Sequence, residues 1–101
     1  MSPAMNSFPP DVILYSRDGC HLCDETRALL SQLLDQRQRG GLPTSRLVER
    51  DITSRAEWED AFRDTIPVVE VAGRRLELAT SAPRIQRLLT EALDRTTLRA
   101  E

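Results

Sequence analysis

The sequence contains no lysine, one histidine and only two cysteines among its 101 residues. A structural zinc site takes four side-chain ligands, and beyond the two cysteines this chain offers only His21 and carboxylates, so we expect no closed zinc site within one chain. No apolar run approaches the roughly 20 residues of a membrane-spanning helix. The first ten residues also lack the positive start and the apolar centre of a secretory signal. We therefore expect neither a membrane partner nor export.

Charge of neither sign dominates the chain. Its 14 basic residues, all arginine, are scattered along the sequence and nearly balanced by 16 acidic residues, which leaves a net charge of −2. Nucleic-acid-binding domains usually carry a clustered excess of basic residues, so we expect no nucleic-acid partner. The length allows one small domain. We expect it to span residues 11–95, between a flexible lead-in at 1–10 and a frayed tail at 96–101.

Apolar periodicity divides this domain into strands and helices. A continuous apolar run at 11–16 indicates a buried strand, and leucines at three- and four-residue steps indicate a helix over about 21–37. The apolar face of that helix should contain Leu22, Thr26, Leu29, Leu30, Leu33 and Leu34. A second strand is expected at 46–52, followed by a helix that begins at Thr53 or Ser54 and includes Trp58, Ala61 and Phe62. Two hairpin strands are expected at 68–71 and 76–78, joined by a turn at 72–75. The last helix is expected from Ser81 through Leu93. The order βαβαββα predicts an α/β domain, a four-stranded mixed sheet covered by helices on both faces.

Both cysteines lie where the first strand passes into the first helix. Cys20 is expected at the helix N-cap, where the free backbone N–H groups of Leu22 and Cys23 point at its sulfur. The helix dipole adds positive potential there, so the pKa of Cys20 should be lowered. Cys23 faces the same way about one turn later and can attack a mixed disulfide formed at Cys20. The pair indicates a redox site with Cys20 as nucleophile and Cys23 as resolving thiol.

Other uses of a Cys-x-x-Cys pair remain open. His21 lies between the cysteines, where it would point away from a metal held by both sulfurs, but a metal shared between two chains stays possible. Haem attachment requires a histidine directly after the second cysteine, and this chain has Asp24 there. A purely structural disulfide across two residues closes almost no loop and would stabilise the fold little.

The order of the elements, with Cys-x-x-Cys after the first strand and Thr65-Ile66-Pro67 before the third, resembles the thioredoxin superfamily. Within it the chain is most similar to glutaredoxins, because it is short and lacks an extra N-terminal strand and helix. The run Leu-Tyr-Ser-Arg-Asp-Gly-Cys-His-Leu-Cys-Asp, residues 14–24, resembles a little-characterised bacterial glutaredoxin-like family in particular. The resemblance covers about residues 12–93. It implies a thioredoxin-like fold and a dithiol–disulfide oxidoreductase.

The resemblance also implies a substrate-binding loop at Thr65-Ile66-Pro67. The bond before Pro67 is expected to be cis, and the loop should lie beside the cysteines. There the backbone of Ile66 would pair with the bound disulfide substrate.

Two charged or ionisable side chains beside the cysteines are further candidates for substrate binding. Arg17 matches the position of a lysine that helps bind glutathione in many glutaredoxins, and its guanidinium could also stabilise a Cys20 thiolate. His21 stands where proline is usual, and a protonated imidazole there would lower the pKa of Cys20. Asp24 and Glu25 suit the first turn of a helix, but their charge opposes thiolate formation.

One feature typical of glutaredoxins is missing. They usually carry Gly-Gly followed by acidic residues after the third strand, which receive glutathione, whereas this chain has Glu77-Leu78-Ala79-Thr80-Ser81. We expect no bound cofactor, with glutathione possible but its usual binding motif incomplete. The expected substrate is a disulfide-containing protein or small-molecule disulfide. The expected electron donor is glutathione or a partner of the thioredoxin-reductase type, and we expect a monomer.

Two other functions are compatible with these residues. Small copper chaperones also place Cys-x-x-Cys between a first strand and helix, so a module binding Cu(I) or zinc is an alternative. They carry methionine where this chain has Asp18, however, and have no equivalent of Thr-Ile-Pro. A thioredoxin-fold interaction module without turnover is the other alternative. Two cysteines in an unexported protein indicate the cytoplasm, where disulfides are usually transient and catalytic.

Overall fold

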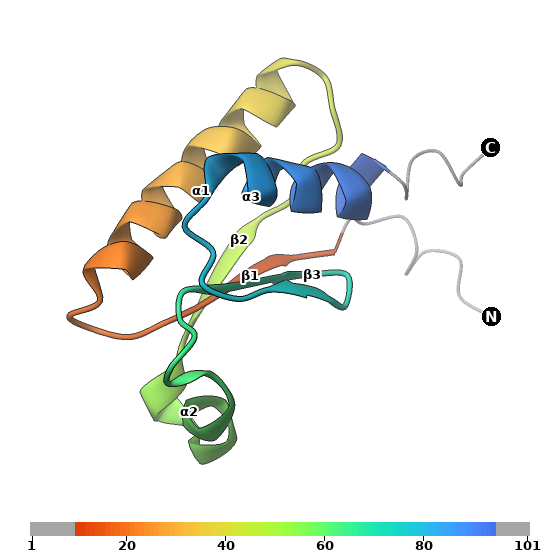
Figure 1. Ribbon diagram of the computed structural model, residues 1–101. Coiled ribbons are helices and arrows are strands. Elements are labelled where there is room, and N and C mark those ends of the chain that lie inside the picture. Colours follow the sequence, from red (N-terminus) through yellow and green to blue (C-terminus); the bar gives the residue numbers. More distant parts are fainter. Residues whose placement is uncertain (1–9, 95–101) are drawn as a thin grey trace, which may run out of the picture.

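Figure 1 shows the computed structural model of the chain, which describes residues 10–94. The strands are β1 (Val12–Ser16), β2 (Leu47–Asp51), β3 (Val68–Val71) and β4 (Arg74–Leu76). The helices are α1 (His21–Arg39), α2 (Ala56–Phe62) and α3 (Ala82–Leu89), with a 3-10 turn (Ile52–Ser54) before α2 and a π-helical turn (Thr90–Asp94) after α3. This is the expected order βαβαββα. Of the expected lead-in only Pro10 is described, and the expected tail lies outside the described residues.

The four strands form one mixed sheet in the order β2-β1-β3-β4. β1 pairs in parallel with β2, from Val12 opposite Leu47 onwards, and α1 supplies the crossover that parallel neighbours require. β1 pairs antiparallel with β3, and β3 pairs antiparallel with β4. Tyr15 near the end of β1 lies opposite Val68, the first residue of β3. The segment that leads into β3 is therefore next to the end of β1 from which the chain continues to the cysteines.

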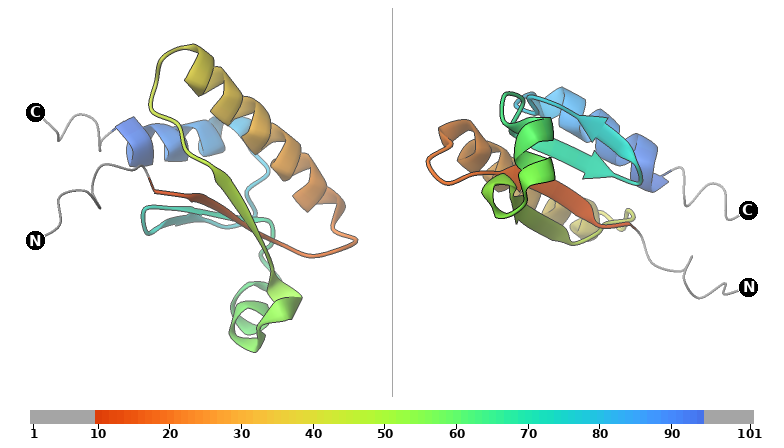
Figure 2. Two further views of the ribbon diagram at one scale, coloured as in Figure 1. Left: turned by 180° about the vertical axis from the view of Figure 1, so that it is seen from behind. Right: turned by 90° about the horizontal axis from the view of Figure 1, so that it is seen from below.

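Helices cover both faces of the sheet, as Figures 1 and 2 show. α1 and α3 lie on one face and bury the main core with alternate strand residues such as Val12 and Leu14. That core comprises Val12, Leu14, Leu30, Leu33, Leu34, Val69, Val71, Ala79, Ile85, Leu88, Leu89, Ala92 and Leu93. α2 lies on the other face, where Phe62 packs in a smaller cluster with Tyr15, Ile52 and Val68. The predicted fold class is confirmed.

The buried face of α1 differs from the expected one at its first turn. Cys23, Thr26 and Leu30 are buried at helical spacing, whereas Leu22 is 47% exposed. Cys23 occupies the buried position one turn before Thr26, which leaves the neighbouring Leu22 facing solvent. At the other end the helix continues to Arg39, two residues beyond the expected limit, and ends at Gly40.

Arg37 near the end of α1 is buried, which the leucine pattern did not indicate. Its Nε donates to the carbonyl of Pro43 at 2.7 Å, and a terminal nitrogen pairs with Asp94. Both contacts satisfy the guanidinium, as a buried charge requires. They join the end of α1 to the following loop and to the turn after α3.

The start of the second helix also differs from the expected one. Asp51 caps the 3-10 turn, accepting hydrogen bonds from the backbone N–H and the hydroxyl of Thr53 at 2.9 and 2.7 Å. α2 begins only after Arg55, which supplies no side-chain cap. Neither Thr53 nor Ser54 is therefore its N-cap, because the carboxylate at the end of β2 already orders the preceding turn.

The hairpin between β3 and β4 is tighter than expected. Its turn consists of Ala72 and Gly73, with φ angles of 53° and 79°. Two consecutive residues with positive φ are typical of the type I′ turn that joins strands through two residues. Because the turn is this short, Arg74 already belongs to β4, which ends at Leu76 and not at Leu78.

Candidate active site

Cys20 lies where the loop after β1 turns into α1. The preceding Gly19 has a φ of 80°, a left-handed conformation that glycine adopts without steric cost. Cys20 is the N-cap of α1, as expected, and its Sγ accepts a hydrogen bond from the backbone N–H of Cys23 at 3.1 Å. That bond and the positive end of the helix dipole both stabilise negative charge on the Cys20 sulfur.

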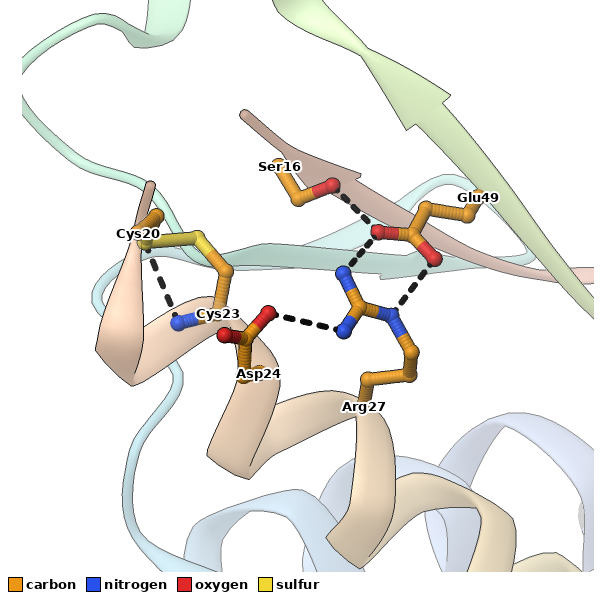
Figure 3. Close-up of polar contacts among 6 residues, drawn as sticks. All are labelled: Ser16, Cys20, Cys23, Asp24, Arg27 and Glu49. Atoms are coloured by element: carbon orange, nitrogen blue, oxygen red, sulfur yellow. Dashed lines mark hydrogen bonds and ion pairs between the residues drawn. A yellow bond between two sulfur atoms is a disulfide. The ribbon is translucent and has the colours of Figure 1, made fainter. Parts of the chain in front are cut away.

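Cys20 and Cys23 are joined in a disulfide, with their Cα atoms 5.2 Å apart (Figure 3). Cys20 is half-buried, whereas Cys23 has no exposed surface. A thiol arriving from solvent can therefore reach the sulfur of Cys20 but not that of Cys23. The pair combines an accessible sulfur with a protected one, which is the arrangement that a nucleophile and a resolving thiol require.

The charged side chains next to the cysteines are paired with one another. The carboxylate of Asp24 accepts a hydrogen bond from Arg27 at 2.8 Å. Glu25 lies 3.0 Å from Nε2 of His21, and both of these side chains are exposed. A partner of opposite charge weakens the field of a carboxylate at a neighbouring group. Pairing with Arg27 therefore weakens the repulsion between Asp24 and a negative charge on Cys20. His21 has Glu25 as its ion-pair neighbour.

Arg27 connects the first turns of α1 to the sheet, as Figure 3 shows. Its guanidinium binds Glu49 of β2 through two hydrogen bonds, one of them from Nε to Oε1 at 2.7 Å. The hydroxyl of Ser16, the last residue of β1, donates to the same carboxylate at 2.6 Å. The hydrogen bond from Arg27 is the main cause that lowers the pKa of Glu49. The three side chains tie the start of α1 to β1 and β2.

Sequence reasoning missed this Ser16–Glu49–Arg27 network. The three-residue spacing of Asp24 and Arg27 was a visible signal of a helical ion pair. The contact with Glu49 depends on the parallel register of β1 and β2, which no local pattern reveals.

Arg17 lies in the exposed loop between β1 and Cys20, on the side that faces β2. Its charge contributes to the lowered pKa of Asp51, after the larger effect of the hydrogen bonds from Thr53. The loop borders a polar hollow of about 590 Å³. The hollow is lined by Ser16, Arg17, Asp18, Gly19, Asp24, Arg27, Glu49 and Asp51.

The peptide bond between Ile66 and Pro67 is cis, the isomer that the resemblance implies. The N–H groups of Thr65 and Ile66 both donate to the carbonyl of Phe62, at 2.9 and 3.1 Å. Within residues 10–94 no hydrogen bond reaches the carbonyl of Ile66. Of the two backbone groups of Ile66 that could pair with a substrate, only the carbonyl is free.

Two hydrogen bonds connect this cis-proline loop to α1. The carbonyl of Pro67 accepts from the N–H of Ala79 at 2.8 Å, and the carbonyl of Ala79 accepts from the buried hydroxyl of Thr26 at 2.7 Å. Thr26 follows Cys23 by three positions, so both lie on one side of α1. The contacts therefore bring Pro67 to the side of α1 that carries Cys23, and they join two motifs far apart in the sequence.

Residues 11–101 match the family described as glutaredoxin-like domain (DUF836). The chain belongs to this glutaredoxin-like family. A search of curated proteins gives no significant match.

Solved structures place the glutaredoxin-like chain among thioredoxin-like folds. A Northeast Structural Genomics target protein from X. campestris is 32% identical, with a TM-score of 0.64 and coverage of 80% of this chain and 97% of that one. Protein Ne2328 from Nitrosomonas europaea is 24% identical, with a TM-score of 0.62 and coverage of 79% and 91%. Trxlp from Edwardsiella tarda is 20% identical, with a TM-score of 0.57 and coverage of 87% and 88%. At these lower identities the last two support the fold alone.

The departure from the usual glutaredoxin pattern lies between β4 and α3. In the first turn of α3 the N–H of Arg84 donates to the side chain of Ser81 at 3.4 Å, and the N–H of Ile85 donates to the carbonyl of Ser81 at 3.0 Å. Pro83 has no N–H to offer. A helix start binds an anion through free backbone N–H groups, and here Ala82 is left to supply one. The incomplete sequence motif for glutathione is thus followed by a helix with an ordinary serine N-cap.

Among residues 10–94, no three cysteine, histidine or carboxylate side chains gather into a group that could hold a metal ion. A metal bound by the two sulfurs would need its remaining ligands from outside this part of the chain. None of the helices formed by the same residues is both long and apolar enough to cross a membrane.

Proposed function

We propose that this glutaredoxin-like protein is a cytoplasmic dithiol–disulfide oxidoreductase that reduces disulfides through Cys20 and Cys23. The observation that supports this most directly is the environment of the two sulfurs. Cys20 is accessible and receives a backbone hydrogen bond at the start of α1, and the fully buried Cys23 is bonded to it. Membership of the family supports a redox role for this pair.

The reaction consists of two thiol–disulfide exchanges. In the reduced protein the Cys20 thiolate attacks one sulfur of a substrate disulfide, forms a mixed disulfide and releases the other sulfur as a thiolate. Cys23, as a thiolate, then attacks the Cys20 sulfur and releases the second substrate thiol. Two electrons have passed from the dithiol to the substrate, and the oxidised protein with its Cys20–Cys23 disulfide must be reduced again.

The surroundings of Cys20 support specific roles in substrate binding. The free carbonyl of Ile66 can accept a hydrogen bond from the backbone of a substrate beside its disulfide. Arg17 and His21 are exposed and lie before and after Cys20 in the sequence, and they can contact the substrate. The incomplete glutathione motif after β4 favours a thioredoxin-reductase-type partner over glutathione as electron donor.

The decisive measurement is the reduction potential of the cysteine pair, obtained by equilibrating metal-free protein in glutathione buffers of graded poise. We expect a reversible two-electron transition between about −200 and −270 mV, the range of related reductases. The Cys23→Ser variant is the control, because it should form a mixed disulfide with glutathione at Cys20 but no intramolecular disulfide. If the wild type forms no Cys20–Cys23 disulfide at any poise, the dithiol mechanism is wrong. Tight stoichiometric uptake of Cu(I) or zinc would then favour a metal-binding module.

A further inference from the structure

Arg27 binds two carboxylates at once, and each of its three hydrogen bonds uses a different nitrogen. Nη1 donates to Asp24 at 2.8 Å, Nε donates to one oxygen of Glu49 at 2.7 Å, and Nη2 donates to the other. The hydrogen bond with Glu49 is the main cause that raises the pKa of Arg27, followed by the one with Asp24. The planar fork of a guanidinium suits this double role better than the compact ammonium of a lysine.

Of the two carboxylates, Asp24 is the one next to Cys20. Its backbone N–H donates to the carbonyl of Cys20 at 3.1 Å, so it lies one helical turn after that residue. Asp24 also lines the same polar hollow as Gly19, which directly precedes Cys20, and as Arg27. Figure 3 shows the carboxylate of Asp24 turned toward Arg27. The charge of Asp24 therefore acts on Cys20, and Arg27 is the partner that compensates it.

The other charged groups near Cys20 have partners of their own or lie on other segments. Glu25 pairs with His21, and Asp51 accepts hydrogen bonds from Thr53. The cis-proline segment 65–67 contains no ionisable side chain. The charged or titratable residues of the segments that meet at Cys20 are Arg17, Asp18, His21, Cys23, Asp24, Glu25 and Arg27 on the loop and α1, Glu49 and Asp51 on β2, and Asp64 and Glu77 beside the cis-proline loop.

The network of Arg27 with its two carboxylates allows charge and structure to be separated. Removing Arg27 leaves two uncompensated carboxylates, whereas removing the charge of Glu49 leaves Arg27 free to compensate Asp24 alone. Both changes break the same hydrogen bonds between α1 and β2. They alter the charge near Cys20 in opposite directions, however, so a structural role and an electrostatic role of Arg27 predict different results.

We propose that Arg27 is a positioning residue for the exchange at Cys20: it holds Asp24 compensated, so that the Cys20 thiolate forms near neutral pH. This inference rests on the proposed function, because a cysteine attacks a disulfide as its thiolate. Arg27 acts through Asp24 and takes no part in the exchange. None of its three hydrogen bonds involves a sulfur atom, so they do not depend on the disulfide.

The test measures the ionisation of Cys20 without any substrate. Fully reduced protein is alkylated with iodoacetamide across the pH range in which thiols ionise, and the rate at Cys20 is followed by mass spectrometry of its peptide. Cys23 has no exposed surface and is protected from the reagent. The pH midpoint of the alkylation rate is the readout, and it is compared among variants.

Arg27→Gln should raise this midpoint by about half a pH unit, which slows alkylation below the midpoint about threefold. Glu49→Gln should leave the midpoint unchanged or lower it. Combining Arg27→Gln with Asp24→Asn should restore the wild-type midpoint, and Arg27→Lys should shift it less than Arg27→Gln. Arg39→Gln is the matched control: it removes the arginine of another ion pair of α1, with Asp35 at 2.9 Å near the other end of the helix, and should not move the midpoint.

Equal shifts in Arg27→Gln and Glu49→Gln would show that only a structural contact was lost, and would overturn the inference. An unchanged midpoint in Arg27→Gln would overturn it as well. If Arg27→Gln does not fold, Asp24→Asn alone provides the test: it should lower the midpoint, and an unchanged midpoint there contradicts the proposal.

Steady-state disulfide reduction by wild type and Cys20→Ser tests the proposed function separately. If the wild type is no faster than Cys20→Ser, the proposed function fails and the inference fails with it, whatever the midpoints. If the wild type reduces disulfides but Arg27→Gln does not shift the midpoint, only the role of Arg27 fails.

Discussion

Both connections of β4 contain a non-glycine residue with positive φ, yet the two have different causes. Ala72 is the first residue of a two-residue hairpin turn, and Gly73 after it also has positive φ, as such a turn requires. Leu78 lies at the other end of β4, where no hairpin demands the conformation. Its N–H donates to the carbonyl of Thr65 next to the cis-proline, and its carbonyl accepts from the N–H of Thr80.

This difference in cause distinguishes the hairpin end of the sheet, at the β3–β4 turn, from the cysteine end, where β4 leads past the cis-proline loop. At the hairpin end, one unusual conformation satisfies the geometry of one turn. At the cysteine end, Gly19 directly precedes Cys20 and Leu78 hydrogen-bonds to Thr65 next to the cis-proline, and both have positive φ. Such conformations persist where the surrounding structure enforces them. The positive φ values of the hairpin end thus belong to one turn, whereas those of the cysteine end lie in two separate segments, before α1 and after β4.

The largest expected effect that sharpens this comparison is the loss of turnover in Cys20→Ser. Disulfide reduction should fall to the rate without protein, because the remaining thiol of Cys23 is fully buried and cannot reach a substrate from solvent. Gly73→Ala at the hairpin end should retain the wild-type rate. A steady-state reductase assay with a protein disulfide distinguishes the two. Substantial activity in Cys20→Ser would contradict the assignment of the nucleophile.

The second effect concerns the contact that joins α1 to the loop after β4. Thr26→Val removes a buried hydroxyl of the same shape and leaves the carbonyl of Ala79 without its partner, so unfolding free energy should fall by about 1–3 kcal/mol. Thr26→Ser keeps the hydroxyl and should lose less. Urea titration measures both variants. A Val variant as stable as the Ser variant would mean that this hydrogen bond does not hold the cysteine end together.

A smaller effect is expected at the hairpin itself. Gly73→Ala should destabilise the fold by about 1 kcal/mol, because alanine resists the left-handed conformation. The φ of Gly73 is 79° and an added Cβ would meet no atom within 4 Å, so the cost arises from the backbone alone. Gly41→Ala, with a φ of 77° and the same open surroundings, is the matched variant elsewhere. Urea unfolding should give similar losses of unfolding free energy in the two variants. A much larger loss for Gly73→Ala would show that Gly73 does more for stability than allow the turn.

The smallest effect is a change in acid stability. Pairing with Arg27 lowers the pKa of Glu49 in the folded protein, so this pair stabilises the fold above the ordinary pKa of glutamate, about 4.3, and its contribution is lost as pH falls through the lowered value. Glu49→Gln and Arg27→Gln should each make unfolding free energy depend less steeply on pH as the pH falls below about 5. Urea titrations across this range provide the measurement. If the slope of unfolding free energy against pH is unchanged in both variants, the Ser16–Glu49–Arg27 network does not contribute to the acid dependence of stability.

The sequence predicts the features that depend on local patterns. The cysteine motif and the apolar run before it locate Cys20 at the start of a helix, and the spacing of Ile85, Leu88 and Leu89 predicts the buried side of α3 correctly. The cis-proline depends on resemblance, because most proline bonds are trans and no local pattern marks this one.

Features that depend on register or on distant partners could not be predicted in this way. The contact of Arg27 with Glu49 requires the pairing of β1 with β2, and the left-handed Leu78 occupies a position where sequence reasoning looks for glycine. The arginines that are scattered along the chain are partly gathered by folding. Four of them line one hollow of about 280 Å³ between β4 and α3: Arg74, Arg75, Arg84 and Arg87.

The aromatic cluster under α2 gives the protein a built-in optical reporter. Trp58, the single tryptophan of the chain, has its ring centroid 5.7 Å from that of Tyr15 and has the guanidinium groups of Arg50 and Arg55 within 5.3 Å of its ring. Its emission therefore monitors the docking of α2 against β1, on the face opposite α1 and α3. Circular dichroism at far-ultraviolet wavelengths is dominated instead by the longer helix α1. Overlaying the denaturation curves from the two signals would show whether the helices on the two faces of the sheet unfold together or in succession.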